Sequence, residues 1–223
     1  MKKILLSIIM SSALMSVSYA GSFGVGVSGS IAHVSADGKE TTTAGDIDGG
    51  AANINNASVD SLSGLATIFV DYEMDNGMAF GLEIVPASAD VSDKTHQRTE
   101  TAQGKSGTDA DGSVTRKADA EVENFTTLYV EYPLGAAYVK AGWSQIDVNT
   151  KEAQVTDSGT YGNTTLDGYT IGLGIRGELG GFFTRTTLEY TDFEDLSLTS
   201  TTSNKIEADL DVTQLKFAIG KRF

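Results

Sequence analysis

The sequence predicts an all-β fold, an eight-stranded antiparallel up-and-down transmembrane β-barrel with short turns at one end and long loops at the other. Three observations lead to this prediction. Apolar and polar residues alternate over eight separate segments. The connections between these segments are short and long in turn. The chain also stops inside its last alternating segment, with Leu215, Phe217, Ile219 and Phe223 on one face, so we expect its final residues to be part of a strand.

The eight predicted strands cover residues 23–34, 62–74, 78–85, 122–132, 137–146, 168–178, 182–193 and the C-terminal segment. A tilted strand needs about 9–11 residues to cross a bilayer, which these segments match. We expect tight periplasmic turns near residues 75–77, 133–135 and 179–181, and long polar extracellular loops near 36–60, 87–120, 149–167 and 194–209. This alternation, with an even number of strands, is typical of outer-membrane barrels.

The turn at residues 75–77 can be predicted in detail. A two-residue Asn-Gly turn would pair Glu73 with Phe80, although alternation places these side chains on opposite faces. A three-residue loop instead pairs Met74 with Met78 and places Gly77 at the left-handed position of a bulge. The sequence therefore predicts a positive φ at Gly77.

The first 20 residues have the pattern of a secretory signal peptide. Lys2 and Lys3 form a basic region, residues 4–17 are mainly apolar, and Ser18-Tyr19-Ala20 offers small residues for cleavage after Ala20. We therefore expect residues 1–20 to be a signal peptide and residues 21–223 to form one barrel domain.

Composition excludes several classes of function. The chain has 30 acidic and 16 basic residues, and loss of the two signal-peptide lysines takes the formal net charge from −14 to −16. Such an acidic surface disfavours nucleic acid and anionic headgroups as partners. The absence of cysteine excludes disulfides, thiolate metal sites and a cysteine nucleophile. We expect no cofactor and no built metal site, and the acidic loops leave divalent cations or an extracellular partner as open alternatives.

The apolar face of the predicted strands carries aromatic residues near both ends and aliphatic residues between them. Aromatic girdles around an aliphatic band are typical of a membrane-spanning surface. A soluble β-sandwich would instead place its largest apolar side chains at the middle of the strands, in the core between the two sheets. The girdle residues are Phe23, Tyr72, Tyr132, Phe182 and Phe223 at the short-turn end, and Trp143, Tyr169 and Tyr190 toward the loops.

The other face carries the candidate site, a network of charges in the lumen. An unpaired buried charge costs several kcal/mol, so most of these residues should form ion pairs. We expect Glu131 and Lys140 to lie diagonally across their hairpin. Arg176 and Arg185 should lie nearly opposite each other, each with an acid chosen from Glu131, Glu178 and Glu189. The network is predicted to contain Glu73, Glu83, Glu131, Lys140, Arg176, Arg185, Glu189 and Lys216, with Asp71 and Glu123 on the same face.

The strand pattern, the loop alternation and the terminal Phe223 together resemble the small outer-membrane β-barrels of the OmpA and OmpX type. The resemblance covers residues 21–223 and includes no extended motif. It implies an integral position in the outer membrane of a Gram-negative bacterium, surrounded by lipid. It also implies a monomer whose C-terminal strand is recognised by the barrel assembly machinery.

The function expected from these features is a structural or surface-interaction role through the acidic extracellular loops. Eight strands leave an interior that side chains fill. The alternative is a narrow porin-like channel for small ions or solutes, with a modest cation preference from surplus lumen acids.

A more distant alternative is a lipid A-modifying enzyme. His33-Val34-Ser35 resembles the His-x-Ser pair of lipid A deacylases, but that family carries the pair late in the chain. A nucleophile also needs an oriented base and a third group, and the sequence offers no such set. We therefore expect no enzymatic activity and no catalytic residues.

Overall fold

The computed structural model describes residues 21–41, 54–90, 96–103, 110–153, 160–201 and 203–223, so the predicted signal peptide lies outside the described residues. The strands are β1 (Gly21–Thr41), β2 (Ile54–Met74), β3 (Ala79–Ile84), β4 (Ala89–Asp90), β5 (His96–Gln103), β6 (Ala110–Leu134), β7 (Ala137–Ala153), β8 (Thr164–Leu179), β9 (Phe182–Phe193), β10 (Leu196–Thr199) and β11 (Lys205–Arg222). In this described part, no helix is long and apolar enough to cross a membrane.

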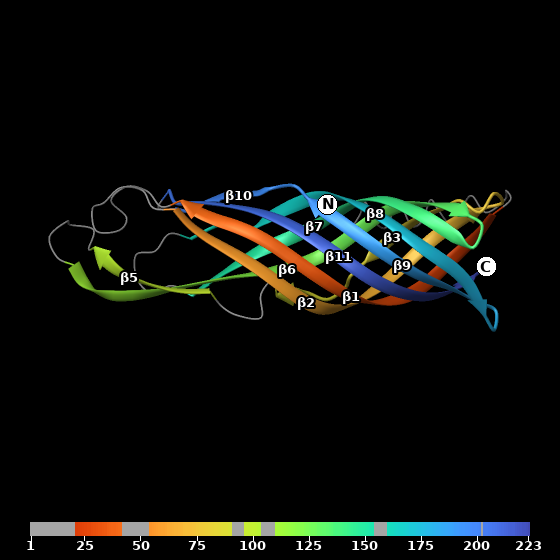
Figure 1. Cartoon of the computed structure of the whole chain (residues 1–223), viewed down its shortest axis with the longest axis horizontal. Helices are drawn as coiled ribbons and strands as arrows, with labels where there is room; N and C mark the ends of the chain where they lie inside the picture. Colours follow the sequence, from red (N-terminus) through yellow and green to blue (C-terminus); the bar gives the residue numbers. More distant parts are fainter. Residues whose placement is uncertain (1–20, 42–53, 91–95, 104–109, 154–159, 202) are drawn as a thin grey trace.

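Eight of these strands close into an antiparallel barrel, which confirms the predicted fold class (Figure 1). Their order is β1-β2-β3-β6-β7-β8-β9-β11, and β11 pairs with β1 from Gly24–Arg222 to Thr41–Lys205. The seam includes the last residue, because Phe223 N donates to Phe23 O at 2.8 Å and Phe23 N donates to Phe223 O at 3.2 Å. The expectation that the C-terminal residues are structured is therefore confirmed.

The strands continue well beyond the predicted loop boundaries. β1 and β2 pair without a shift from Gly21–Met74 out to Thr41–Ile54, within the stretch 36–60 expected to be a loop. β5 pairs with β6 inside the predicted loop 87–120, and β10 pairs with β11 inside the predicted loop 194–209. The loop prediction was too broad because a ladder of backbone hydrogen bonds does not require apolar side chains. In Figure 1 these extensions and β5 lie at the opposite end from the C-terminus.

The short turns have the expected backbone conformation. Gly77 has a φ of +81°, as predicted. Met74 N donates to Met78 O at 2.8 Å, and Gly77 N donates to Met74 O at 2.8 Å, which confirms the three-residue loop. Gly135, Gly180 and Gly181 also have positive φ in the other two turns.

A β-bulge in β6 changes which residues face inward above it. The register against β7 shifts between Glu123 and Thr126, and Asn124 adopts a φ of +55°. The sequence analysis placed Glu123 in the lumen, and this is wrong. Above the bulge Val122 lines the interior, while Glu123 pairs with Asp147 on the outer face. The extra residue reverses the inward-outward alternation, which strict period-two counting does not include.

The barrel wall is interrupted on one side in its loop half. β2 pairs with β3 over a short stretch, from Glu73–Ala79 to Ile68–Ile84. β3 then ends, and Pro86, which has no N–H to donate, follows within two residues. Among the described residues, the remainder of β2 (Ile54–Thr67) pairs with β1 on one edge and with no strand on the other.

Replacement of Gly77 by alanine should destabilise the barrel. The left-handed conformation costs a non-glycine residue about 1–2 kcal/mol, and the new Cβ would lie 3.1 Å from Pro133 Cγ. Urea unfolding of the refolded protein in lipid vesicles measures this cost. The matched control is Gly29→Ala, because a Cβ at Gly29 meets nothing within 4 Å. Equal stability of the two variants would contradict the assigned turn.

Candidate functional site in the barrel interior

Alternation along the strands brings the charged candidates into the lumen. Asp71 and Glu73 come from β2, Glu83 from β3, and Glu131 from β6. The opposing bases come from four other strands, which are β7 (Lys140), β8 (Arg176), β9 (Arg185) and β11 (Lys216 and Arg222). The site is therefore assembled from residues that are distant in sequence, and it depends on closure of the barrel.

Four residues form a ring of alternating charge across the lumen. Lys140 Nζ lies 2.9 Å from Glu83 and 2.9 Å from Glu189. Lys216 Nζ lies 2.8 Å from Glu83 and 2.9 Å from Glu189. The four side chains are between 1% and 10% exposed. Each ammonium thus contacts two carboxylates and each carboxylate two ammonium groups, so the buried charges are compensated.

A second layer toward the short turns is built from three arginines and three acids. Arg185 binds Asp71 and lies 3.4 Å from Glu131. Arg176 lies 2.7 Å from Glu131 and 3.4 Å from Glu73, and also donates to Gly77 O at 2.9 Å. Arg222 lies 3.0 Å from Asp71 and also binds Glu73. Every arginine therefore bridges two acids, which joins β2, β6, β8, β9 and β11 at this level.

Aromatic rings fill the space between these charges. The guanidinium of Arg185 lies 4.8 Å from the ring centre of Phe183, and that of Arg222 lies 4.5 Å from the same ring. Lys140 lies 4.3 Å from the ring centre of Tyr129. Cations over aromatic faces gain attraction in a desolvated site. Aromatic rings therefore pack directly against the charged side chains in this half of the lumen.

The predicted pairings hold in part. Arg176 and Arg185 are directly opposed, and both use Glu131, one of the three acids considered. Glu131 and Lys140 are directly opposed rather than diagonal, and Lys140 reaches across the lumen to Glu83 and Glu189 instead. Glu178 is exposed near the β8–β9 turn.

Sequence reasoning missed Arg222, although it shares the inward parity of Lys216. With Arg222 included and Glu123 excluded, the network contains five acids and five bases. The surplus of lumen acids assumed for the channel alternative is therefore absent from this network. The period-two count from Phe223 would have been sufficient to find Arg222.

Hydroxyl groups form the next layer toward the loops. Hydrogen bonds join Thr127 to Ser144 at 2.9 Å, Ser144 to Thr170 at 2.7 Å, and Thr170 to Thr191 at 2.7 Å. This chain crosses β6, β7, β8 and β9 in order. Across the seam, Ser30 Oγ donates to Gln214 Oε1 at 3.0 Å.

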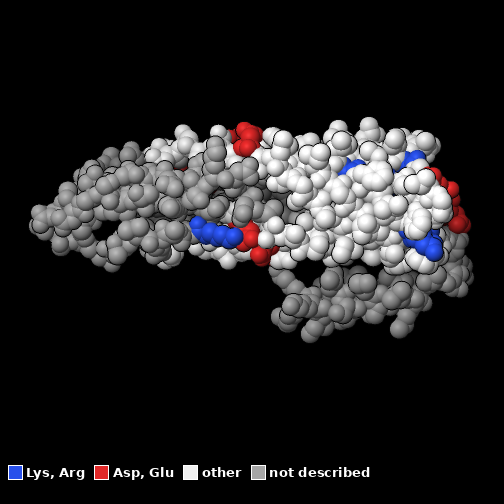
Figure 2. Space-filling view, turned by 90° about the horizontal axis from the view of Figure 1, so that it is seen from below, with Lys and Arg blue, Asp and Glu red and all other residues white. Residues whose placement is uncertain are grey.

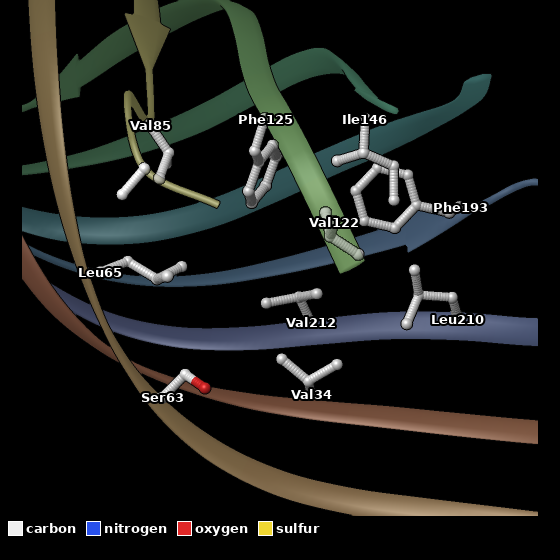
Figure 3. A pocket seen from close by; sticks show the side chains of 11 residues that line it. Val34, Ser63, Leu65, Val85, Val122, Phe125, Ile146, Phe193, Leu210 and Val212 are labelled. Carbon is white, nitrogen blue, oxygen red and sulfur yellow. The ribbon is translucent and has the colours of Figure 1, made fainter. Parts of the chain in front are cut away.

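Above the hydroxyls the interior becomes apolar, which the sequence analysis did not predict. The buried cluster consists of Ala32, Ile146, Val148, Leu166, Phe193, Leu210 and Val212. Phe125 packs edge-on against Phe193, with ring centres 5.7 Å apart. Ile146, Phe193, Leu210 and Val212 of this cluster line a common interior space together with Phe125 (Figure 3). The sequence does contain a pattern that indicates this apolar layer. In β11, odd-numbered residues face outward and even-numbered residues face inward, and the apolar residues change from odd positions such as Leu215 to even positions such as Leu210.

The outer surface has the pattern expected of a membrane-facing wall. Large apolar side chains such as Ile31, Leu128, Ile171 and Leu215 are more than half exposed. Six of the girdle candidates, Tyr132, Trp143, Tyr169, Phe182, Tyr190 and Phe223, are exposed, while Phe23 and Tyr72 are partly buried. Figure 2 shows a broad uncharged area on one face, with most charged residues toward its ends.

The enzyme alternative gains no structural support from the residues that suggested it. His33 and Ser35 lie on the outer face of β1, and His33 Nε2 lies 3.5 Å from Asp60. Within the described residues, no group of three or more His, Asp or Glu side chains is arranged to hold a metal ion.

A closed eight-stranded barrel with an apolar, aromatic-rich exterior and a charged, packed interior is an integral outer-membrane β-barrel protein. No protein-family model matches the chain, and no curated protein matches it. Similar solved structures include OprG from Pseudomonas aeruginosa, with 14% identity, 90% of this chain and 96% of that chain covered, and a TM-score of 0.46.

Two further similar structures have different roles in their own descriptions. One is Ail, the attachment invasion locus protein of Yersinia pestis, with 10% identity, coverage of 89% of this chain and 99% of that chain, and a TM-score of 0.43. The other is the outer membrane protease OmpT from Escherichia coli, with 10% identity, coverage of 91% and 97%, and a TM-score of 0.41. These low scores carry no activity or ligand over to this chain, whose fold rests on its own strand pairing.

Replacement of Lys140 by methionine should destabilise the barrel strongly, because Glu83 and Glu189 would then share Lys216 alone. Breaking a buried ion pair costs about 3–5 kcal/mol. Addition of Glu189→Gln should recover part of this loss. The control is Lys205→Met, which removes an exposed partner of Glu207 and should change stability little. If Lys140→Met and Lys205→Met unfold at the same urea concentration, the buried ring does not stabilise the protein.

Proposed function

We propose that this outer-membrane barrel is closed to ions and acts through its extracellular surface, where an acidic recess binds cationic groups of a partner. The observation that carries the proposal is a recess of about 690 Å³ on the loop half of β1, β2, β10 and β11. Asp37, Asp195 and Asp209 contribute to its lining. The structural role of the barrel is to hold this surface rigidly outside the membrane.

The interior supports closure. The ring of Lys140, Lys216, Glu83 and Glu189 occupies the lumen, and its charges are balanced. The apolar cluster lies above it, so an ion would pass two barriers of opposite chemistry. Moving an ion from water into apolar surroundings has a large unfavourable free energy. A packed layer of charged side chains also leaves no path for an ion that keeps its hydration shell.

Acidic residues in and beside the recess lie directly opposite one another. Asp37 and Asp209 are directly opposed across β1 and β11, and Asp192 and Asp211 are directly opposed across β9 and β11. Repulsion from Asp195, and to a lesser extent from Asp37 and Asp192, raises the pKa of Asp209 above its usual value. Opposed like charges are unfavourable, so a bound cationic group would relieve the repulsion.

One acid of the recess is already neutralised. Glu207 accepts hydrogen bonds from Lys205 and Lys39, and these bonds lower the pKa of its carboxyl group. Lys39 and Lys205 lie 3.1 Å and 2.7 Å from Glu207. The binding charge of the recess therefore comes from the aspartates, and the partner chemistry that fits it is a lysine- or arginine-rich segment.

The remaining features expected from the sequence are part of the same proposal. Residues 1–20 act as a signal peptide, and the assembly machinery recognises the strand that ends at Phe223. The barrel works as a monomer, and its girdle residues anchor it in lipid. The ladder that extends to Phe223 at the seam supports the role of the terminal strand.

Refolded protein should give no conductance steps in a planar lipid bilayer. The charged ring and the apolar cluster should both block ions, unlike the aqueous channel of a 16- to 18-stranded porin, which serves as the positive control. Reproducible steps from this protein would contradict closure and favour the channel alternative.

The variant Asp195→Asn/Asp209→Asn should weaken binding of a fluorescein-labelled octalysine peptide to the protein in lipid nanodiscs. Because the variant removes two exposed ion pairs between aspartates and peptide lysines, the affinity should fall roughly fivefold. Fluorescence anisotropy at low salt measures this change. The matched control, Asp75→Asn/Glu178→Gln, removes the same charge at the short-turn end and should bind nearly as well as the wild type. Equal effects of the two variants would show attraction by net charge without a local site.

Binding of the same peptide should weaken as the pH falls from 7 toward 4. Asp209 takes up its proton at a higher pH than an ordinary aspartate, because Asp195 raises its pKa. Asp195→Asn alone should therefore move the pH midpoint of binding downward. A midpoint that stays in place would show that these two carboxylates do not interact at the site.

A further inference from the structure

The interruption in the barrel wall lies beside the apolar part of the interior. Where β3 leaves β2, each side of the interruption contributes to the lining of one cavity. Ser63 and Leu65 come from β2, and Val85 and Ala87 come from the segment after β3. Among the described residues, no strand pairing closes the wall between these two segments. The cavity thus reaches the wall at the place where the backbone ladder is missing.

The chemistry of this cavity selects an apolar occupant. Its volume is about 40 Å³, and all the lining side chains except Ser63 are apolar. Figure 3 shows Val122, Phe125 and Val212 directed into the same space as Leu65 and Val85. A cavity of this kind holds water poorly, since water needs two to four polar partners, whereas it binds small apolar groups. Its size suits the end of a hydrocarbon chain and excludes a whole lipid.

The outer side of the interruption faces the apolar layer of the membrane. Leu62 and Ile68 of β2 point outward and are 69% and 56% exposed, so residues 62–68 belong to the lipid-facing surface. Between them lie the small outward residues Gly64 and Ala66, and a Cβ at Gly64 would meet nothing within 4 Å. On the other side Ala87 is exposed while Val85 is buried, so the segment 85–88 runs from the cavity to the surface.

We propose that this cavity binds the end of an alkyl chain from a lipid of the surrounding leaflet, which enters sideways between residues 62–67 of β2 and residues 85–88. The lipid headgroup stays at the membrane surface, and the chain end contacts Leu65, Val85 and Val122. The driving force is burial of apolar surface in a preformed site. This binding site is independent of the acidic recess, and either assignment can fail while the other holds.

Methyl-detected NMR of the whole protein in nanodiscs tests the assignment. Leu and Val methyl groups are labelled, and the lipid is dimyristoyl phosphatidylcholine with protonated chains. We expect cross-peaks between chain methylene or methyl protons and the inward methyls of Leu65, Val85 and Val122. The outward methyls of Leu62 supply the positive control for lipid contact. Loss of the inward cross-peaks with chain-deuterated lipid identifies the bilayer as the source of the chain.

The variant Ala87→Phe tests the route. A large side chain at this exposed position should close the opening and remove the cross-peaks to Val122, while those to Leu62 remain. The matched control is Ala141→Phe, on the lipid-facing surface of β7, which should leave all cross-peaks unchanged. If wild-type protein shows lipid cross-peaks at Leu62 and none at Val122, the binding site is overturned. If Ala87→Phe keeps the cross-peaks to Val122, the sideways entry is overturned.

Discussion

The structure depends on four buried side chains that neutralise one another across the lumen. Lys140, Lys216, Glu83 and Glu189 belong to β7, β11, β3 and β9, and every one of their short contacts joins two of these strands. The strands can place these groups together only when the barrel is closed. Removal of any member leaves a buried charge undercompensated, whereas the complete ring is satisfied. The ring therefore forms only when the sheet closes, and once formed it fills the lumen. This is the basis of the proposal that the barrel does not conduct ions.

The remaining interior is arranged in layers that follow from this ring. Arginines and acids lie toward the short turns, hydroxyls lie toward the loops, and the apolar cluster lies beyond them. The exterior is apolar because its solvent is lipid, so the barrel has apolar surface both outside and in the loop half of its lumen. Where the wall is interrupted beside β2, these two apolar regions meet. The acidic recess lies on the loop half of the strands, beyond the uncharged wall.

Local alternation predicted most of the fold, while contacts across the barrel could not be predicted. The strands, the terminal strand and the conformation of Gly77 follow from period-two patterning and turn geometry, which involve neighbouring residues. The choice of Glu83 and Glu189 by Lys140 depends on barrel radius and strand stagger, which no single strand encodes. The bulge at Asn124 moved Glu123 from the expected lumen face to the outer face and directed Val122 into the interior. Arg222 and the inward Leu210 share the even-numbered, inward parity of Lys216 in the terminal strand, so both could have been predicted from alternation alone.

A double-mutant cycle on Glu83 and Lys216 tests the central claim most directly. The free energies of unfolding of Glu83→Gln, Lys216→Met and the double variant are measured in lipid vesicles. If the ring holds the barrel together, the two effects are strongly non-additive, with a coupling of about 1–3 kcal/mol. Additive effects, within about 0.5 kcal/mol, would show that the two residues do not interact in the folded protein and would contradict the account.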